Sequence, residues 1–337
     1  MWVSFSGRFP KTFAMHEDKL LQITDPTGAL AVIAPELGGW LLRYARPTAK
    51  HGLVDALHFG QAVVDRYPKE MWAGNPLLFP MVSFNHLPGR EHHYAWGGRE
   101  FALGQHGFAR RSAWSVVTQS ESALTMELTD SDATRAVYPF AFVHRVTYRL
   151  DAGRMHFEQT VENRGAEPMP FSTGIHPYFQ VPLTPRGERN RCFVKIPACH
   201  RLTPDARHEH FTATPQAASE LSVAQDIAHT LFLGEFAKPE LTLVDPASEL
   251  EIVLNWEDAP QHRYCALWSR TTDAPFYCLE PWTALPNSFT RAQPGEVIVL
   301  AAGETFRAAM WMELQLHPLR EMVAEENRAE ANLKKRI

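Results

Sequence analysis

The stretch "FVHRVTYRLDAGRMHFEQTVEN" (residues 142–163) decides the fold class, because apolar and polar side chains alternate along both of its halves. Val146 and Tyr148 stand two positions apart before the turn "DAG", and Met155 and Phe157 do the same after it. A period of two is typical of a strand with one buried face. Two such runs joined by a glycine-containing turn predict an antiparallel hairpin.

Outside this hairpin, short strand-like segments recur along most of the chain. They are residues 20–24, 30–34, 40–45, 112–118, 123–129, 192–196, 241–245, 250–256, 264–269 and 297–303. Turn sequences such as "WGGRE" (96–100) and "DPASE" (245–249) separate them. The 25 prolines suit strand edges and connecting loops.

A helical pattern is convincing only at the end of the chain. The segment "LREMVAEENRAEANLKKR" (319–336) carries acidic residues early and basic residues late, an order that complements the helix dipole. We see no linker, repeat or low-complexity segment. The sequence therefore predicts an all-β protein, with one large antiparallel β-sandwich domain over residues 1–315 and a helical tail over 316–337.

Composition and charge narrow the class of partner. The net charge is −5 with both signs interspersed, which disfavours nucleic acid or a membrane surface as the main partner. No apolar run approaches the roughly 18 residues of a membrane span, and the first residues lack a signal-peptide pattern. The four cysteines form no CxxC pair, and we interpret them as reduced thiols. We expect a cytoplasmic protein, either a monomer or a homodimer.

Three segments place ionisable residues among aromatic and turn residues. They are "GQHGFARRSAW" (104–114), with His106 and Arg110; "STGIHPYF" (172–179), with His176; and "YCLEPWTALPNSF" (277–289), with Glu280 and Trp282. Taken singly, each has an ordinary structural interpretation, such as a hydrogen-bonded histidine or a strand end before proline. Taken together, aromatic faces suit the apolar side of a sugar ring, and the charged groups suit its hydroxyls. The set favours an uncharged polyol over a lipid or a nucleotide.

Several short motifs, in order along the chain, resemble the aldose 1-epimerase (galactose mutarotase) family over roughly residues 20–315. They are "GNPLLFP" (74–80), "HGFAR" (106–110), "HPYF" (176–179), "EPW" (280–282) and "PGEVIVLAAGETF" (294–306). The resemblance implies the galactose mutarotase-like supersandwich fold. It also implies a cofactor-independent isomerase that interconverts the α and β anomers of a monosaccharide, with an aldohexose as the expected substrate.

By the same resemblance, the catalytic acid falls on His176 and the catalytic base on Glu280. His106 would hold the substrate near the ring oxygen, with Arg110 in support. Anomer interconversion requires removing a proton from the C1 hydroxyl while adding one to the ring oxygen. A carboxylate and an imidazolium can perform both transfers without a metal or cofactor.

Four further residues are predicted to contact the substrate: Trp72, Asn75, Tyr178 and Trp282. Family members that act on hexose 6-phosphates carry an arginine where this chain has Trp72, so an indole here favours a neutral sugar ring. Tyr178 would either form the pocket wall or anchor the strand beneath it, and the sequence leaves both interpretations open.

The chain departs from the family pattern at the residues that read the sugar. Where galactose mutarotases carry an arginine after the Phe-Pro, "MVSFNHL" (81–87) offers only Ser83, Asn85 and His86. The family's hydroxyl-binding aspartate should fall near "AHTLFLG" (228–234), where this chain has His229, with Asp226 nearby and Asp245 further on. The identity of the sugar therefore stays open.

Four alternatives remain. The chain could be a non-catalytic sugar sensor on the same scaffold, or an epimerase for a hexose 6-phosphate. It could also support epimerisation within a larger enzyme complex, with the tail helix as a docking element, although the sequence favours a solvated capping helix. A metal enzyme is the fourth, because His92 with His93 and His208 with His210 are closely spaced. No carboxylate and third histidine follow at metal-site spacing, so we expect no catalytic metal.

Overall fold

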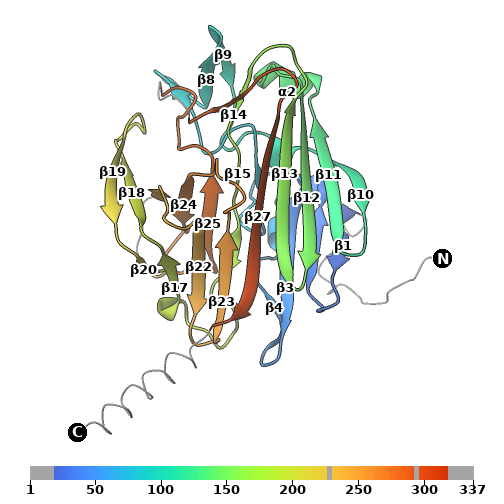
Figure 1. Ribbon diagram of the computed structural model, residues 1–337, viewed down its shortest axis with the longest axis vertical. Helices are drawn as coiled ribbons and strands as arrows, with labels where there is room; N and C mark the ends of the chain where they lie inside the picture. Colours follow the sequence, from blue (N-terminus) through green and yellow to red (C-terminus); the bar gives the residue numbers. More distant parts are fainter. Residues whose placement is uncertain (1–18, 226–229, 292–295, 318–337) are drawn as a thin grey trace, which may run out of the picture.

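Two large antiparallel sheets contain most of the strands in the computed structural model, which describes residues 19–225, 230–291 and 296–317 (Figure 1). Within these residues the larger sheet has nine strands, in the spatial order β10 (Ser115–Gln119), β11 (Ala123–Thr129), β12 (Phe142–Asp151), β13 (Arg154–Asn163), β27 (Thr305–Leu316), β23 (Leu250–Asn255), β22 (Glu240–Asp245), β17 (Phe193–Ile196) and β20 (Ser219–Ser222).

The second sheet carries the candidate site. Its described strands run in the order β19 (Phe211–Gln216), β18 (Cys199–Pro204), β21 (Leu231–Gly234), β24 (Tyr264–Trp268), β25 (Phe276–Trp282), β15 (Gly174–Ile175) and β5 (Leu77–Leu78), and β16 (Tyr178–Gln180) also pairs with β25.

Smaller elements complete the described part of the fold. The four-stranded sheet contains β1 (Leu21–Thr24), β2 (Leu30–Ala34), β3 (Trp40–Thr48) and β4 (Gly52–Asp55). The two-stranded pairs are β14 (Met169–Phe171) with β26 (Ile298–Leu300), β6 (His86–Leu87) with β7 (Arg90–Glu91), and β8 (His93–Trp96) with β9 (Arg99–Ala102). The short helices are α1 (Gln61–Val64) and α2 (Asp132–Val137), with 3₁₀ turns η3 (Pro35–Leu37), η4 (Ala109–Arg111) and η5 (Arg189–Arg191).

The predicted hairpin is confirmed as β12 and β13, which pair from Phe142 opposite Asn163 to Asp151 opposite Arg154. Its tight turn consists of Ala152 and Gly153, whose φ angles are 52° and 85°. Two positive φ angles are what a type I′ hairpin turn requires, and the glycine adopts its angle at little steric cost.

Strand β27, which was not predicted from the sequence, lies between β13 and β23 at the centre of the larger sheet (Figure 1). Its side chains do alternate, with Phe306, Met310 and Leu314 buried and Arg307 exposed. The run "AAMWM" (308–312) hides this alternation, because five consecutive residues of the strand are apolar. Only pairing with strands on both sides identifies the segment.

The main hydrophobic core lies between the two large sheets. One cluster of buried side chains contains Val146, Phe157 and Met310 from the nine-stranded sheet together with Leu267 and Leu279 from the second sheet. This arrangement confirms the predicted all-β sandwich. The predicted helix over 319–336 lies outside the described residues.

Strand β25 shows how the sandwich creates a site. Tyr277 and Leu279 point into the shared core, whereas Phe276 and Cys278 belong to a separate cluster on the other face of the sheet. Because side chains alternate along a strand, Glu280 points to that second face too. Among the described helices, none is long and apolar enough to cross a membrane.

Candidate active site

A cavity of about 410 Å³ opens on the face of the second sheet that points away from the shared core. This volume lies within the range of small-molecule sites. Its lining includes every residue predicted to bind or convert the substrate except Asn75: Trp72, His106, Arg110, His176, Tyr178, Glu280 and Trp282. The remaining lining residues are Ser83, Phe84, Gln105, Pro204, His208, Thr230, Phe232 and Trp268.

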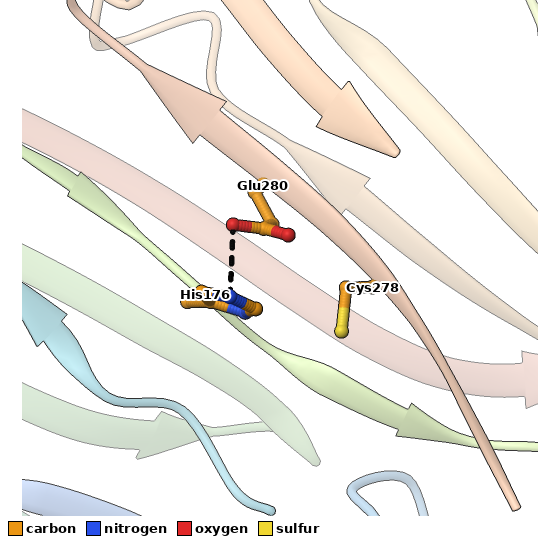
Figure 2. Close-up of side chains that lie close together, drawn as sticks. All are labelled: His176, Cys278 and Glu280. Atoms are coloured by element: carbon orange, nitrogen blue, oxygen red, sulfur yellow. Dashed lines mark ion pairs between the residues drawn. The ribbon is translucent and has the colours of Figure 1, made fainter. Parts of the chain in front are cut away.

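Glu280 and His176 meet at the floor of this cavity. Glu280 lies on β25, and His176 lies in the connection between β15 and β16, both of which pair with β25. This pairing brings the two segments together although about a hundred residues separate them in the chain. The His176 Nε2 atom is 3.2 Å from the Glu280 Oε2 atom, and both side chains are buried (Figure 2).

Two neighbouring residues hold His176 in place. The backbone N–H of His176 donates to the Oδ1 atom of Asn75 at 2.9 Å. Its ring stacks on Tyr178, with ring centroids 4.6 Å apart and planes 1° from parallel, and its Nε2 atom is 3.4 Å from the Tyr178 hydroxyl oxygen. Asn75 is fully buried and does not line the cavity, so it lies where it can position His176 rather than contact a sugar.

Burial favours the uncharged forms of both His176 and Glu280. It raises the pKa of Glu280 well above its usual value, and the nearby Arg110 only partly opposes this. Burial, with Arg110 adding to it, lowers the pKa of His176 to about 3. Burial therefore favours the uncharged pair, a carboxylic acid beside a neutral imidazole. The ion-paired form contains the same number of protons, so a single proton shift interconverts the two forms.

His106 presents a defined hydrogen-bonding edge to the cavity. Its backbone has a φ angle of 62°, and its Nδ1 atom accepts a hydrogen bond from the Ser83 N–H at 3.0 Å. A neutral imidazole that accepts at Nδ1 carries its proton on Nε2. Burial, followed by Arg110 and His176, lowers the pKa of His106 well below its usual value. His106 therefore offers an N–H donor to a ligand.

Arg110 supplies positive charge within the cavity. Its Nη2 atom donates to the Gln105 carbonyl at 2.9 Å, while its Nε atom is buried without a hydrogen-bond partner among the described residues. Burial lowers the pKa of Arg110 to about 10, so the guanidinium remains charged at neutral pH. A buried donor of this kind favours a ligand oxygen.

Aromatic side chains form much of the wall. Trp72, Tyr178 and Trp282 were predicted, whereas Phe84, Phe232 and Trp268 were not. Trp268 ends strand β24 opposite Cys278 of β25, so its place near His176 and Glu280 follows from strand pairing. The feature of the sequence that could have identified Trp268 was its position at the end of a strand, beside a turn. Ring faces of this type stack on the apolar face of a pyranose.

Where the chain departs from the family pattern, some of its residues line the cavity and others lie away from it. Ser83 lines the cavity, but Asn85 is buried elsewhere and its Oδ1 atom accepts from the Phe289 N–H at 2.8 Å. Asp245 is also buried away from the cavity, where it accepts from the Leu183 N–H at 2.9 Å. Asp226 and His229 lie outside the described residues. The described part of the cavity thus shows no carboxylate other than Glu280.

The predicted histidine pairs do not form a shared ligand cluster in the described structure. His208 lines the cavity, whereas His210 does not, and His92 is exposed at the distant β7–β8 turn. The described group of three potential metal ligands is instead His176, Cys278 and Glu280. Sequence spacing missed this group because His176 lies about a hundred residues before Cys278 and Glu280, which are both on β25.

Comparison with known proteins finds a family that matches most of the chain. The sequence model of the family described as aldose 1-epimerase matches residues 19–313. The plasmid-encoded protein LacX of Lactococcus lactis subsp. lactis is 27% identical over 237 residues, which cover 65% of this chain and 77% of LacX.

Solved structures show the same fold. A galactose mutarotase related enzyme from Lactobacillus acidophilus matches with a TM-score of 0.72 and 22% identity, covering 88% of this chain and 97% of that chain. A galactose 1-epimerase from Lactobacillus acidophilus NCFM matches with a TM-score of 0.66 and 12% identity, covering 88% and 94%. At sequence identities this low, the structural matches establish the supersandwich fold and nothing more specific.

Proposed function

We propose that this chain, which belongs to the aldose 1-epimerase family, catalyses the interconversion of the α and β anomers of a neutral aldohexose. The observation that carries this proposal is the buried contact of 3.2 Å between His176 Nε2 and Glu280 Oε2 at the floor of a monosaccharide-sized cavity. The two oxygens that exchange protons in mutarotation are both bonded to C1 of the sugar. Two groups this close together can therefore reach both oxygens at once.

The reaction begins with the ion-paired form of the pair. The Glu280 carboxylate removes the proton of the C1 hydroxyl, and the His176 imidazolium donates a proton to the ring oxygen. The bond between C1 and the ring oxygen breaks with its electrons moving to the oxygen, while the deprotonated oxygen forms the aldehyde. The pair is left as a carboxylic acid beside a neutral imidazole, the form that burial stabilises.

Rotation about the C1–C2 bond then exposes the other face of the aldehyde. Ring closure runs the same proton transfers in reverse and returns the pair to its starting form. The Nε2–H group of His106 and the guanidinium of Arg110 lie in the same cavity and can hold sugar oxygens during opening. Trp72 and Trp268 can stack on the sugar ring.

The charges of the cavity favour a neutral sugar. Among the described lining residues, Arg110 is the one permanent cation, and Glu280 lies in the same cavity. A hexose 6-phosphate is the second candidate, because the Arg270 guanidinium stacks on the ring of Trp72 at 3.8 Å and brings a second cation to the cavity wall. A non-catalytic sugar sensor would not require the close acid–base pair.

Polarimetry of freshly dissolved α-glucose, α-galactose and α-glucose 6-phosphate tests the proposal. We expect the protein to accelerate the approach to anomeric equilibrium, with the neutral sugars preferred. Glu280→Gln should lower kcat by at least about 100-fold, since a positioned general base typically contributes that much.

Glu251→Gln is a matched control, because Glu251 is another buried strand glutamate, on β23 of the other sheet. Equal rates for Glu280→Gln and the unaltered protein would refute the acid–base assignment. Sugar binding without any rate acceleration would favour the sensor.

A further inference from the structure

Cys278 is a buried thiol beside the catalytic pair that the proposed reaction does not use. It precedes Glu280 by two residues on β25, so both side chains project from the same face of the strand (Figure 2). It pairs in register with Tyr178. The Cys278 Sγ atom, a ring nitrogen of His176 and a carboxylate oxygen of Glu280 all lie within 4.8 Å of one another. The three side chains are almost wholly shielded from solvent.

These donors suit one class of cation. Zinc binds thiolate, imidazole and carboxylate at about 2.0 to 2.3 Å, which places ligand atoms roughly 3 to 4 Å apart around the ion. Small side-chain rotations therefore suffice to close this group around such an ion. Magnesium and calcium prefer sets made of oxygen donors and would gain little from a thiol.

A second observation points to a ligand at this place. The Nδ1 atom of His176 is buried without a hydrogen-bond partner among the described residues, and the buried Glu280 Oε2 atom has its 3.2 Å ion-pair contact with His176 Nε2 but no hydrogen bond to a described residue. Buried polar atoms without partners are costly, and an ion at the floor of the cavity would satisfy the carboxylate.

We propose that His176, Cys278 and Glu280 bind a thiophilic divalent cation of the Zn²⁺ class and leave a fourth coordination position open to the cavity. Coordination deprotonates a thiol outright, so a neutral thiol in the metal-free protein does not prevent binding. The cation occupies the same imidazole and carboxylate that would exchange protons with the sugar. Resting on the proposed function, this makes the cation a reversible inhibitor of mutarotation.

Cobalt(II) is a direct probe, because a thiolate-to-cobalt charge-transfer band in the near ultraviolet reports a Co–S bond. We expect this band when the tag-free full chain is titrated with Co²⁺, and its loss on addition of one equivalent of Zn²⁺. Cys278→Ser should abolish the band and weaken Co²⁺ binding by more than about 10-fold, since altering even the supporting residues of metal sites costs 10- to 100-fold.

Cys265→Ser is the matched control, because Cys265 is an equally buried thiol on the neighbouring strand β24, in register with Pro281 rather than Glu280. It should retain the band, and circular dichroism should show that both variants are folded. Absence of the band in the unaltered protein would overturn the metal site. So would a band of equal intensity in folded Cys278→Ser.

A separate measurement tests inhibition. Zn²⁺ should slow mutarotation in competition with the sugar, EDTA should restore the rate, and Mg²⁺ at the same concentration should have no effect. An unchanged rate at a Zn²⁺ concentration that saturates the site would overturn the inhibitory role. Failure of the proposed function is distinguishable, because a protein without mutarotase activity would still show the cobalt band.

Discussion

Tyr178 packs directly against the imidazole of His176. Its ring stacks on the imidazole, and its hydroxyl oxygen is 3.4 Å from the Nε2 atom that faces Glu280. Stacking limits the orientation of the imidazole, while the hydroxyl group can stabilise its charge during proton transfer. The two contributions can be separated by removing only the hydroxyl.

We therefore expect Tyr178→Phe to retain sugar binding and lower kcat by roughly 3- to 10-fold, because one net hydrogen bond contributes about 0.5–1.5 kcal/mol. Polarimetric measurement of kcat and KM tests this at the residue scale. Tyr277→Phe is the control, since the Tyr277 ring is buried on the opposite face of β25. An unchanged kcat in Tyr178→Phe would show that the hydroxyl group lines the pocket without stabilising the charge of the imidazole.

At the scale of elements, the site depends on how closely β15 approaches β25. Gly174 pairs with Trp282, and a Cβ atom at Gly174 would lie 2.5 Å from the Trp282 Cδ1 atom and 2.7 Å from the Pro281 carbonyl oxygen. Any side chain here would separate the strands. His176 lies two residues beyond Gly174, so its distance from Glu280 depends on this glycine.

Gly174→Ala should consequently destabilise the fold by about 1–3 kcal/mol, as overpacking does, and should also reduce kcat. Urea unfolding and polarimetry measure the two effects. Gly60→Ala provides the control, because a Cβ atom at Gly60 meets no atom within 4 Å and its φ angle is not positive. A Gly174→Ala protein with unaltered stability would contradict the close packing of these strands.

At the scale of the whole molecule, buried neutral histidines couple stability to pH. His144 and His262 lie in the core on either side of Gln159, whose Oε1 atom is 3.2 Å from His144 Nε2 and whose Nε2 atom is 3.4 Å from His262 Nε2. Burial lowers the pKa of each to about 3, although a hydrogen bond opposes the shift in each case. The rings of Phe79 and Trp114 pack against His144.

The direction of this pH dependence follows from whether the folded or the unfolded state binds protons at the higher pH. Below pH 6.5 the unfolded chain protonates these histidines while the folded protein does not, so stability falls as the pH decreases toward 3. Each histidine should lower the free energy of unfolding by roughly 2 kcal/mol at pH 5 relative to pH 7 and above. His144→Gln should remove about that much of the pH dependence of the urea unfolding free energy.

His92→Gln, at an exposed position, is the control and should leave the pH dependence unchanged. If His144→Gln unfolds with the full pH dependence of the unaltered protein, His144 is not a neutral core residue.

Local sequence patterns were sufficient to predict the all-β class, most strand positions and the family. These follow from local properties: alternation along 142–163 identifies a hairpin without knowledge of any partner strand, and the order of "HGFAR", "HPYF" and "EPW" identifies the family. The residue types of His176 and Glu280 also suffice to suggest acid–base chemistry.

Three further features became clear from the tertiary structure. It placed β27 between β13 and β23, put Asn75 beneath His176 rather than in the cavity, and brought Cys278 and Trp268 to the catalytic pair. These features depend on contacts between segments that are distant in the chain: β27 with β13, Asn75 with His176, and β25 with the segment that carries His176. Alternation gives the faces of a strand, but only the register between strands decides which side chains meet across them.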